Sequence, residues 1–220
     1  MRFFLNEIPA TGSILWSVST KLNETMKTTV IMLAALALAA SAFAVELGKP
    51  APDFTGPGIN GKTVKLSDYQ GKIVVLESYN SDCPFCHNQY SGAAQALQKQ
   101  LADKGVVWLM INSVNPRNPS HRTPAQARQE WSDLKIGATA WIDDSSGDIG
   151  HLYGMRTTPH VFVVDKSGNL VYEGAMDDHP DPFHDPKTAR NYVREAVDDL
   201  IAGKPIEVSQ TKPYGCAIHY

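Results

Sequence analysis

Runs of apolar residues alternate along the chain with segments rich in helix-forming residues. The clearest run, at residues 73–76, is aliphatic without a polar break, which is typical of a strand buried on both faces of a partly parallel sheet. A turn-rich break follows it, and residues 89–104 then carry helix formers up to a Lys-Gly pair that suits a helix terminus. This pattern predicts a central strand that leads through a turn into a helix.

The remaining elements follow from the same alternation. We expect further strands at residues 63–66, 106–112, 138–142, 161–165 and 170–174, and helices at residues 125–134, 148–153 and 188–202. Residues 45–62 hold several Gly and Pro residues and the turn pair Asn60-Gly61, so they predict an extended lead-in with a β-hairpin. The order β-α-β-α-β-α-β-β-α predicts an α/β fold in which helices flank a central mixed sheet.

Residues 26–44 have the pattern of a secretory signal peptide. Lys27 gives a basic start, residues 30–40 are apolar, and residues 42–44 read A-F-A, a cleavage signal of small residues. The apolar run is shorter than the roughly 20 residues of a membrane span, so we favour cleavage over an uncleaved anchor and expect no stable membrane insertion afterwards. Met26 suits the start of such a signal, so we interpret residues 1–25 as an N-terminal extension that precedes the true start.

Composition then bounds the folded part. With 43% hydrophobic and 20% charged residues, the chain can bury one good core. Its net charge is -3, and it becomes -4 for the 176 residues that follow residue 44, which predicts no nucleic-acid partner. We expect one domain at residues 45–203 and a C-terminal tail at residues 204–220, in a protein exported to the periplasm or, as the second choice, secreted.

Three cysteines carry the candidate chemistry. They are too few for a disulfide scaffold, and export favours redox use over a zinc-thiolate site. Cys83 precedes Pro84, which suits the first position of a helix, so the helix dipole and free backbone N–H groups would stabilise a thiolate at Cys83. We therefore predict that Cys83 is the nucleophile and that Cys86, further inside the helix, resolves the mixed disulfide formed on it.

Several motifs together resemble a known family. They read V-V-L-E…D-C-P-F-C, G-V-V-W-L-M-I-N-S, Y-G-M-R-T-T-P-H-V-F-V-V-D, L-V-Y-E-G-A-M-D-D and, at the end, K-P-Y-G-C-A-I-H-Y. The sequence resembles the thioredoxin-like superfamily and, within it, exported redoxin-domain proteins related to the peroxiredoxin-like and TlpA-like groups. The resemblance covers about residues 46–220 and implies a thioredoxin-like fold.

The resemblance also implies roles for single residues. Pro159 would be a cis-proline beside the active-site disulfide, and the backbone of Thr158 would be free to pair with an extended substrate. Pro84 and Phe85, between the cysteines, would contact that substrate. Glu77 would be a buried acid below the cysteines, where burial raises its pKa so that it can take a proton from the resolving thiol; the alternative is an edge residue in solvent.

The predicted function is that of an exported thiol-disulfide oxidoreductase. It would exchange electrons with protein thiols or disulfides, draw on a separate electron donor, and need no bound cofactor, because the dithiol itself carries two electrons. The alternative is a thiol peroxidase that reduces hydroperoxides through Cys83. Peroxiredoxins, however, place a threonine or serine and an earlier proline where this chain has Asn80 and Leu76, which argues against peroxidase activity. A third class is a binding module whose disulfide is structural.

Three further features have competing interpretations. C-x-x-C-H is also the attachment motif of c-type haem, with His87 as axial ligand, but Pro84 and the preceding buried strand favour the thiol interpretation. His179 and His184 stand among four aspartates at residues 177–185, which we expect to be a solvated loop and not a metal site. Cys216 is a free thiol, a partner for another chain or a third redox thiol that the tail brings near Cys83, and we favour the last.

Overall fold

The computed structural model describes residues 45–220. The predicted extension at residues 1–25 and the predicted signal peptide at residues 26–44 therefore lie outside the described residues. Within residues 45–220, no helix is both long and apolar enough to cross a membrane.

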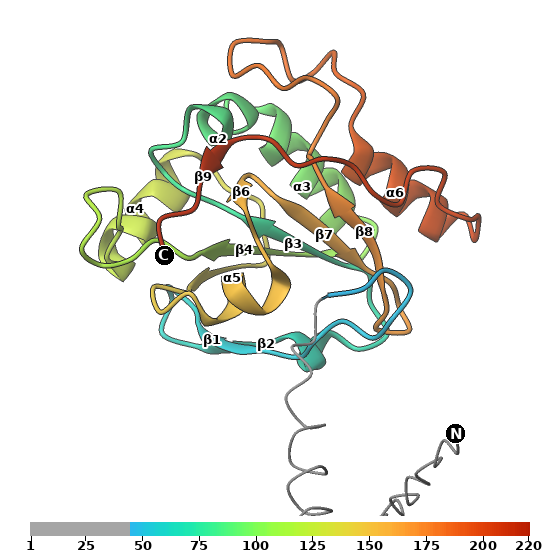
Figure 1. Cartoon of the computed structure of the whole chain (residues 1–220), viewed down its shortest axis with the longest axis horizontal. Coiled ribbons are helices and arrows are strands. Elements are labelled where there is room, and N and C mark those ends of the chain that lie inside the picture. Colours follow the sequence, from blue (N-terminus) through green and yellow to red (C-terminus); the bar gives the residue numbers. More distant parts are fainter. Residues whose placement is uncertain (1–44) are drawn as a thin grey trace, which may run out of the picture. The chain divides into compact units, whose positions relative to one another are not determined.

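A five-stranded mixed sheet forms the centre of the fold, with the strand order β5-β4-β3-β7-β8 (Figure 1). The strands are β3 (Val74–Ser78), β4 (Val107–Asn112), β5 (Ala140–Asp143), β7 (Val161–Val164) and β8 (Leu170–Gly174). β3 runs parallel to β4, and β4 runs parallel to β5, whereas β7 is antiparallel to both β3 and β8. All five residues of β3 are buried, as expected for a strand covered on both faces. The thioredoxin-like α/β fold predicted from the sequence is confirmed.

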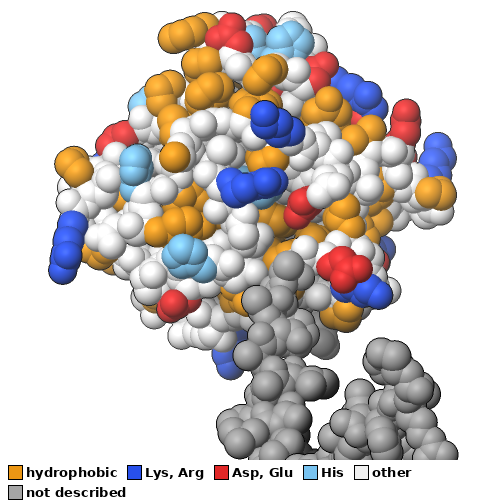
Figure 2. All heavy atoms as spheres, in the orientation of Figure 1, with side chains coloured by type: hydrophobic (Ala, Val, Ile, Leu, Met, Phe, Trp, Pro, Cys, Tyr) orange, Lys and Arg blue, Asp and Glu red, His pale blue; other side chains and the backbone are white. Residues whose placement is uncertain are grey.

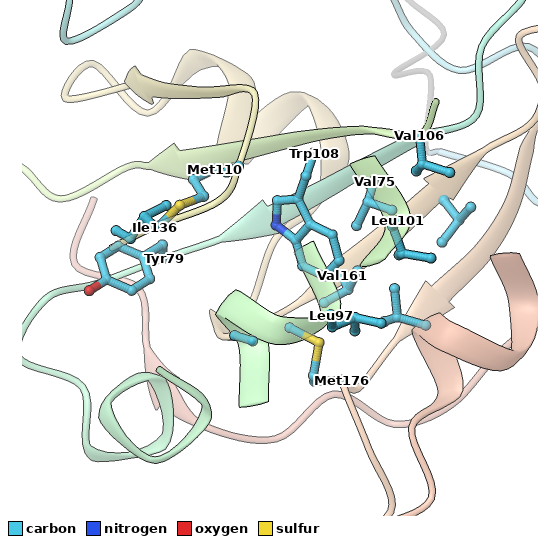
Figure 3. Close-up of a cluster of buried hydrophobic side chains, with 14 of the residues drawn as sticks. Val75, Tyr79, Leu97, Leu101, Val106, Trp108, Met110, Ile136, Val161 and Met176 are labelled. Carbon is cyan, nitrogen blue, oxygen red and sulfur yellow. The ribbon is translucent and has the colours of Figure 1, made fainter. Parts of the chain in front are cut away.

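Two hydrophobic clusters pack on opposite faces of this sheet, because successive residues of β3 point to opposite sides. Val75 belongs to the cluster that includes residues of α3 (Ala93–Ala102) and α6 (Tyr192–Ile201), and Ala127 of α4 (Pro124–Asp133) joins it. Figure 3 shows Val75, Trp108, Leu97 and Leu101 of this cluster together. Val74 and Leu76 belong to the other cluster, which includes residues of α5 (Asp148–Tyr153).

An N-terminal hairpin covers part of the second face. β1 (Thr55–Pro57) pairs antiparallel with β2 (Thr63–Lys65) around the predicted Asn60-Gly61 turn, and the short helix η2 (Leu66–Tyr69) follows. Gly61 has a φ of 80°, a conformation that glycine adopts without steric cost. The predicted hairpin extension is therefore confirmed.

The helix predicted at residues 89–104 is wrong as a single element. The structure has two helices, α2 (Pro84–Gln89) and α3, separated by residues 90–92. Gly92 has a φ of 129°, which an α-helix cannot contain, and it caps the start of α3. The break makes α2 a short separate helix that carries both cysteines of the C-P-F-C motif, with Cys83 as its N-cap.

The last predicted helix begins later than expected, at Tyr192 instead of residue 188. The side chain of Asn191 accepts a hydrogen bond from the backbone N–H of Arg194, which is the usual role of an N-cap residue. The N-cap side chain therefore sets the first residue of α6, which the distribution of helix-forming residues alone does not locate.

Candidate active site

Cys83 lies at the N-terminus of α2, directly after the central strand β3. It is the N-cap residue with extended backbone dihedral angles, and Pro84 occupies the first helical turn. Only 1% of Cys83 is exposed, and Cys86, one turn along the helix, is completely buried. Both are free thiols in this structure. The predicted pair therefore meets at one helix terminus, where unpaired backbone N–H groups favour negative charge.

The second half of the site comes from the short strand β6 (Thr157–Thr158) and Pro159. The peptide bond between Thr158 and Pro159 is cis. The sulfur of Cys83 lies 2.9 Å from the carbonyl oxygen of Thr158. Ser78, at the end of β3, holds this loop, because its hydroxyl accepts a hydrogen bond of 2.8 Å from the backbone N–H of His160. The fold thus brings the turn after β3 and the T-T-P segment together.

The C-terminal segment brings a third sulfur into the site. β9 (Cys216–Ala217) pairs antiparallel with β6, and Cys216 stands opposite Thr158. The two sulfurs of Cys83 and Cys216 are 2.7 Å apart, although 133 residues separate them in the chain. Figure 1 shows the C-terminal segment, in dark red, running from α6 across the molecule to β9, beside β6 and α2. The expectation that the backbone of Thr158 is free is therefore wrong, because the protein's own C-terminal segment pairs with it.

The electrostatics of the site differentiate the first two thiols. The pKa of Cys83 is lowered well below its usual range, chiefly by a hydrogen bond with Cys86, and further by hydrogen bonds with Cys216 and Thr158, while burial opposes the shift. Burial raises the pKa of Cys86 well above its usual range, and the neighbouring Cys83 sulfur adds to this shift. The arrangement therefore favours a thiolate at Cys83 and a protonated thiol at Cys86 at neutral pH.

Cys216 differs from both. Burial, followed by its hydrogen bond with Cys83 and the charge there, raises the pKa of Cys216 to about 12, and a hydrogen bond from the backbone N–H of Phe85 opposes the shift. Cys216 is partly exposed, whereas the other two sulfurs are buried. Of the three thiols, it is the one that solvent reaches most readily.

Glu77 lies inside the protein on the same face of β3 as Val75. Its side chain has no solvent exposure, so the alternative of an edge residue in solvent is wrong. Tyr90 Oη and Trp108 Nε1 donate hydrogen bonds of 2.7 and 2.8 Å to its Oε2 atom. Burial raises the pKa of Glu77 to about 7, against the effect of these two hydrogen bonds. Its charge contributes to the raised pKa of Cys86, so the carboxylate acts on the buried thiol.

His87 and the loop at residues 177–186 lie around this centre. His87 is exposed on α2, and its Nε2 atom contacts the carbonyl oxygen of Ser81. The loop is not simply solvated as predicted, because Asp177 is only 1% exposed. Its carboxylate accepts hydrogen bonds from Gln89 Nε2, at 2.5 Å, and from the Tyr214 hydroxyl. Asp177 therefore links the end of α2 to the C-terminal segment.

Sequence reasoning missed the residues that seat the C-terminal segment on the site. Tyr214 reaches Asp177, and its ring centroid is 5.7 Å from that of Phe85 in the C-P-F-C motif. The K-P-Y-G-C motif is part of the resemblance, but nothing in its linear pattern shows that it returns to β6. The motif itself, with an aromatic residue and a glycine directly before a cysteine, was the available signal.

Comparison with known proteins assigns the family. The family model described as AhpC/TSA family matches residues 47–173, more than half of the chain. The chain belongs to the AhpC/TSA family. Two relatives differ in the activity that their names state. The thiol-disulfide oxidoreductase ResA of Bacillus thuringiensis subsp. konkukian is 27% identical over 129 residues, or 59% of this chain and 69% of that protein. Peroxiredoxin 2 of Caldanaerobacter subterraneus subsp. tengcongensis is 33% identical over 131 residues, or 54% and 56%.

Solved structures show the same fold. An uncharacterised conserved protein from Geobacillus kaustophilus is 25% identical, with a TM-score of 0.73 over 81% of this chain and 94% of that one. A hypothetical protein from Sinorhizobium meliloti 1021 is also 25% identical, with a TM-score of 0.72 over 80% and 96%. A candidate thiol:disulfide interchange protein DsbE from Chlorobium tepidum, at 23% identity and a TM-score of 0.51 over 73% and 98%, shares the fold. Together these findings support an oxidoreductase enzyme with a thioredoxin-like fold.

Proposed function

We propose that this AhpC/TSA family member is an exported thiol-disulfide oxidoreductase that uses Cys83 and Cys86 to exchange electrons with protein disulfides. The observation that carries the proposal is the split between two neighbouring thiols: one at a helix N-terminus with a lowered pKa, the other buried behind it with a raised pKa. Thiol-disulfide exchange needs these two roles: a thiolate that attacks the substrate disulfide and a second thiol that resolves the mixed disulfide.

The steps balance without a cofactor. The Cys83 thiolate attacks one sulfur of a substrate disulfide, so a mixed disulfide forms and the other substrate sulfur leaves as a thiolate. Cys86 loses its proton and attacks the Cys83 sulfur, which releases the second substrate thiol and leaves a Cys83–Cys86 disulfide. Glu77 takes the Cys86 proton, a role that suits a buried carboxyl with a pKa of about 7. Pro84, Phe85, Thr158 and Pro159 line the approach to Cys83 in this proposal, and a separate electron donor restores the dithiol.

Reduction of a protein disulfide such as that of insulin, driven by a small dithiol, tests the assignment. We expect turnover by the wild type, none by Cys83→Ser, and an accumulated mixed disulfide in Cys86→Ser. Full turnover by Cys83→Ser would overturn the proposal. A very low reduction potential together with no exchange would instead indicate a structural disulfide.

A thiol peroxidase is the second candidate, because one relative is named a peroxiredoxin. In that reaction the Cys83 thiolate attacks a hydroperoxide, becomes a sulfenic acid and releases an alcohol or water, after which Cys86 forms the disulfide and releases water. Asn80 stands where a hydroxyl side chain is expected for that chemistry, and its Oδ1 atom accepts a hydrogen bond from the backbone N–H of Asp82. Hydrogen peroxide turnover that exceeds protein disulfide reduction would favour the peroxidase.

Covalent c-type haem at C-x-x-C-H is a weaker alternative. The burial of both motif cysteines argues against it, because a haem bonded to both sulfurs would have to displace the residues that now cover them. A Soret band in the purified protein would support the haem alternative, and its absence after expression with a haem-attachment system would remove it.

Export and partners complete the proposal. The apolar segment at residues 30–40 supports export, most simply to the periplasm, and intact-mass analysis of protein recovered from that compartment should give a chain that begins at Val45. A chain retaining residues 26–44 would contradict signal cleavage.

On the face shown in Figure 2, basic and acidic side chains are interspersed, which suits protein thiol or hydroperoxide substrates better than nucleic acid.

A further inference from the structure

The last residues of the chain are fixed to the site at three places. Tyr214 donates a hydrogen bond to the buried Asp177 and packs against Phe85. Beyond Cys216, the carbonyl oxygen of His219 accepts a hydrogen bond of 2.7 Å from the backbone N–H of Asn115. Tyr220 then stacks on His151, with ring centroids 3.9 Å apart, and its hydroxyl donates to the carbonyl oxygen of Met155. The segment is therefore held on both sides of Cys216.

Between these anchors the segment runs as an extended strand against the cis-proline loop. Cys216 pairs with Thr158, the residue directly before Pro159. Gly215 has a φ of 142°, and a Cβ atom there would lie 2.1 Å from the carbonyl oxygen of Thr158. Only glycine permits this approach, so the segment is shaped to lie against that carbonyl.

The segment also covers the nucleophile. Cys83 is 1% exposed and has the Cys216 sulfur 2.7 Å away, so its sulfur faces another thiol instead of solvent. A disulfide bond is about 2.05 Å long, so an approach of about 0.7 Å would bring these two sulfurs to bonding distance. A substrate protein would need to adopt the same arrangement: an extended strand that pairs with Thr158 and a cysteine whose sulfur lies next to that of Cys83.

We propose that residues 213–220 are an internal substrate of this site and that Cys216 forms a reversible disulfide with Cys83. The proposal rests on the exchange function proposed above and assigns a regulator to the same site. Since the segment holds the place of an external strand, a substrate protein gains access only when the segment leaves. Cys216, the most exposed of the three sulfurs, is the point at which a partner's thiol opens the closed form.

The chemistry balances with a small disulfide as the oxidant. The Cys83 thiolate attacks oxidised glutathione, forms a glutathione adduct and releases one reduced glutathione. Cys216 then loses its proton and attacks the Cys83 sulfur, which forms the Cys83–Cys216 bond and releases the second glutathione. Two electrons have passed from the two cysteines to glutathione disulfide. In the wild type, Cys86 can attack Cys83 in turn and free Cys216, an exchange with no net oxidation.

Removing the competing thiol makes the proposed bond measurable. Purified, reduced Cys86→Ser protein is incubated with oxidised glutathione and analysed by intact mass and peptide mapping under non-reducing conditions. We expect a Cys83–Cys216 linked peptide and no glutathione adduct. The control Cys86→Ser/Cys216→Ser should carry one glutathione on Cys83. A second control, Cys86→Ser/Gly215→Ala, keeps all the sulfurs but displaces the strand, so it should shift the product from the link to the adduct.

The outcomes separate this inference from the function it rests on. A stable adduct on Cys83 in the Cys86→Ser protein, with Cys216 still reduced, overturns the internal-substrate proposal even if the wild type reduces insulin. A link that forms equally well in the Gly215→Ala control also overturns it, because bonding would then not depend on the strand. Formation of the link without any reduction of protein disulfides would refute the proposed exchange function and leave the bond itself established.

Discussion

Tyr90 Oη donates a hydrogen bond of 2.7 Å to Oε2 of Glu77, and both side chains are buried. The other carboxylate oxygen, Oε1, has no hydrogen-bond partner. Burial of the carboxyl group disfavours the negative charge, and it raises the pKa of Glu77 to about 7 although two donors stabilise Oε2. Glu77 therefore titrates near neutral pH, and its charge acts on Cys86, the thiol that must lose a proton.

The first prediction concerns the pH dependence of stability. Between the ordinary value of 4.5 and about 7, the folded protein keeps a proton on Glu77 that the unfolded chain releases. The free energy of unfolding should therefore fall as pH rises through this window, by roughly 3 kcal/mol in total from this group. Glu77→Gln, which resembles the protonated acid, should lose this fall. Urea unfolding of both proteins at several pH values measures the difference.

The same substitution should slow resolution, because glutamine cannot take the Cys86 proton. We expect a loss on the order of 100-fold in the rate at which a Cys83 mixed disulfide is resolved, with the attack by Cys83 itself little changed. Stopped-flow measurement of the two steps separates them. Equal slopes of stability against pH in the two proteins, or an unchanged resolution rate, would contradict the role given to Glu77.

Much of this site could be predicted from the sequence because its central part is local. The C-P-F-C motif at a helix start and the T-T-P motif before a strand each determine the local backbone conformation. The parallel and antiparallel pairings of β3 then bring the two motifs together. The place of Cys216 near Cys83 followed only from the family resemblance and from no local pattern. It depends on Tyr214, Gly215 and Tyr220 fitting partners far away in the chain, and such long-range contacts leave no periodic pattern.

Trp108 gives a third prediction. Its indole N–H donates to Oε2 of Glu77, a bond that lowers the pKa of Glu77 against the effect of burial. Trp108→Phe removes the donor, so the pKa of Glu77 should rise above about 7, and the fall of stability with pH should extend to higher pH. Carboxyl NMR titration of Glu77 measures the shift directly. Trp141→Phe, a second buried tryptophan with no bond to Glu77, serves as the control and should leave that titration in place.

A fourth prediction tests the support of the cis-proline loop. The Ser78 hydroxyl accepts from the backbone N–H of His160 and donates to the carbonyl oxygen of Thr157. Ser78→Ala leaves both groups without this partner, which should cost about 1–3 kcal/mol and lower exchange activity because Pro159 is carried by the same loop. Ser81→Ala is the matched control, since the buried Ser81 hydroxyl has no partner to lose. Equal free energies of unfolding for the two variants would contradict this account.

The last prediction concerns how firmly the C-terminal segment covers Cys83. Tyr214→Phe removes the hydrogen bond to Asp177 upstream of Cys216, and Tyr220→Phe removes the bond to the carbonyl oxygen of Met155 downstream of it. Each change should weaken the closed form by about 1 kcal/mol, so alkylation of Cys83 in the reduced protein should be faster by about fivefold, and by more in the double variant.

Tyr153→Phe is the control for these variants. It loses a comparable hydrogen bond, from its hydroxyl to the carbonyl oxygen of Pro52 at 2.6 Å, on the other face of the sheet. We expect it to reduce the free energy of unfolding without changing the alkylation rate of Cys83. If the control accelerated alkylation as much as the Tyr214 and Tyr220 variants, exposure of Cys83 would follow from general loosening of the fold and not from release of the segment that carries Cys216.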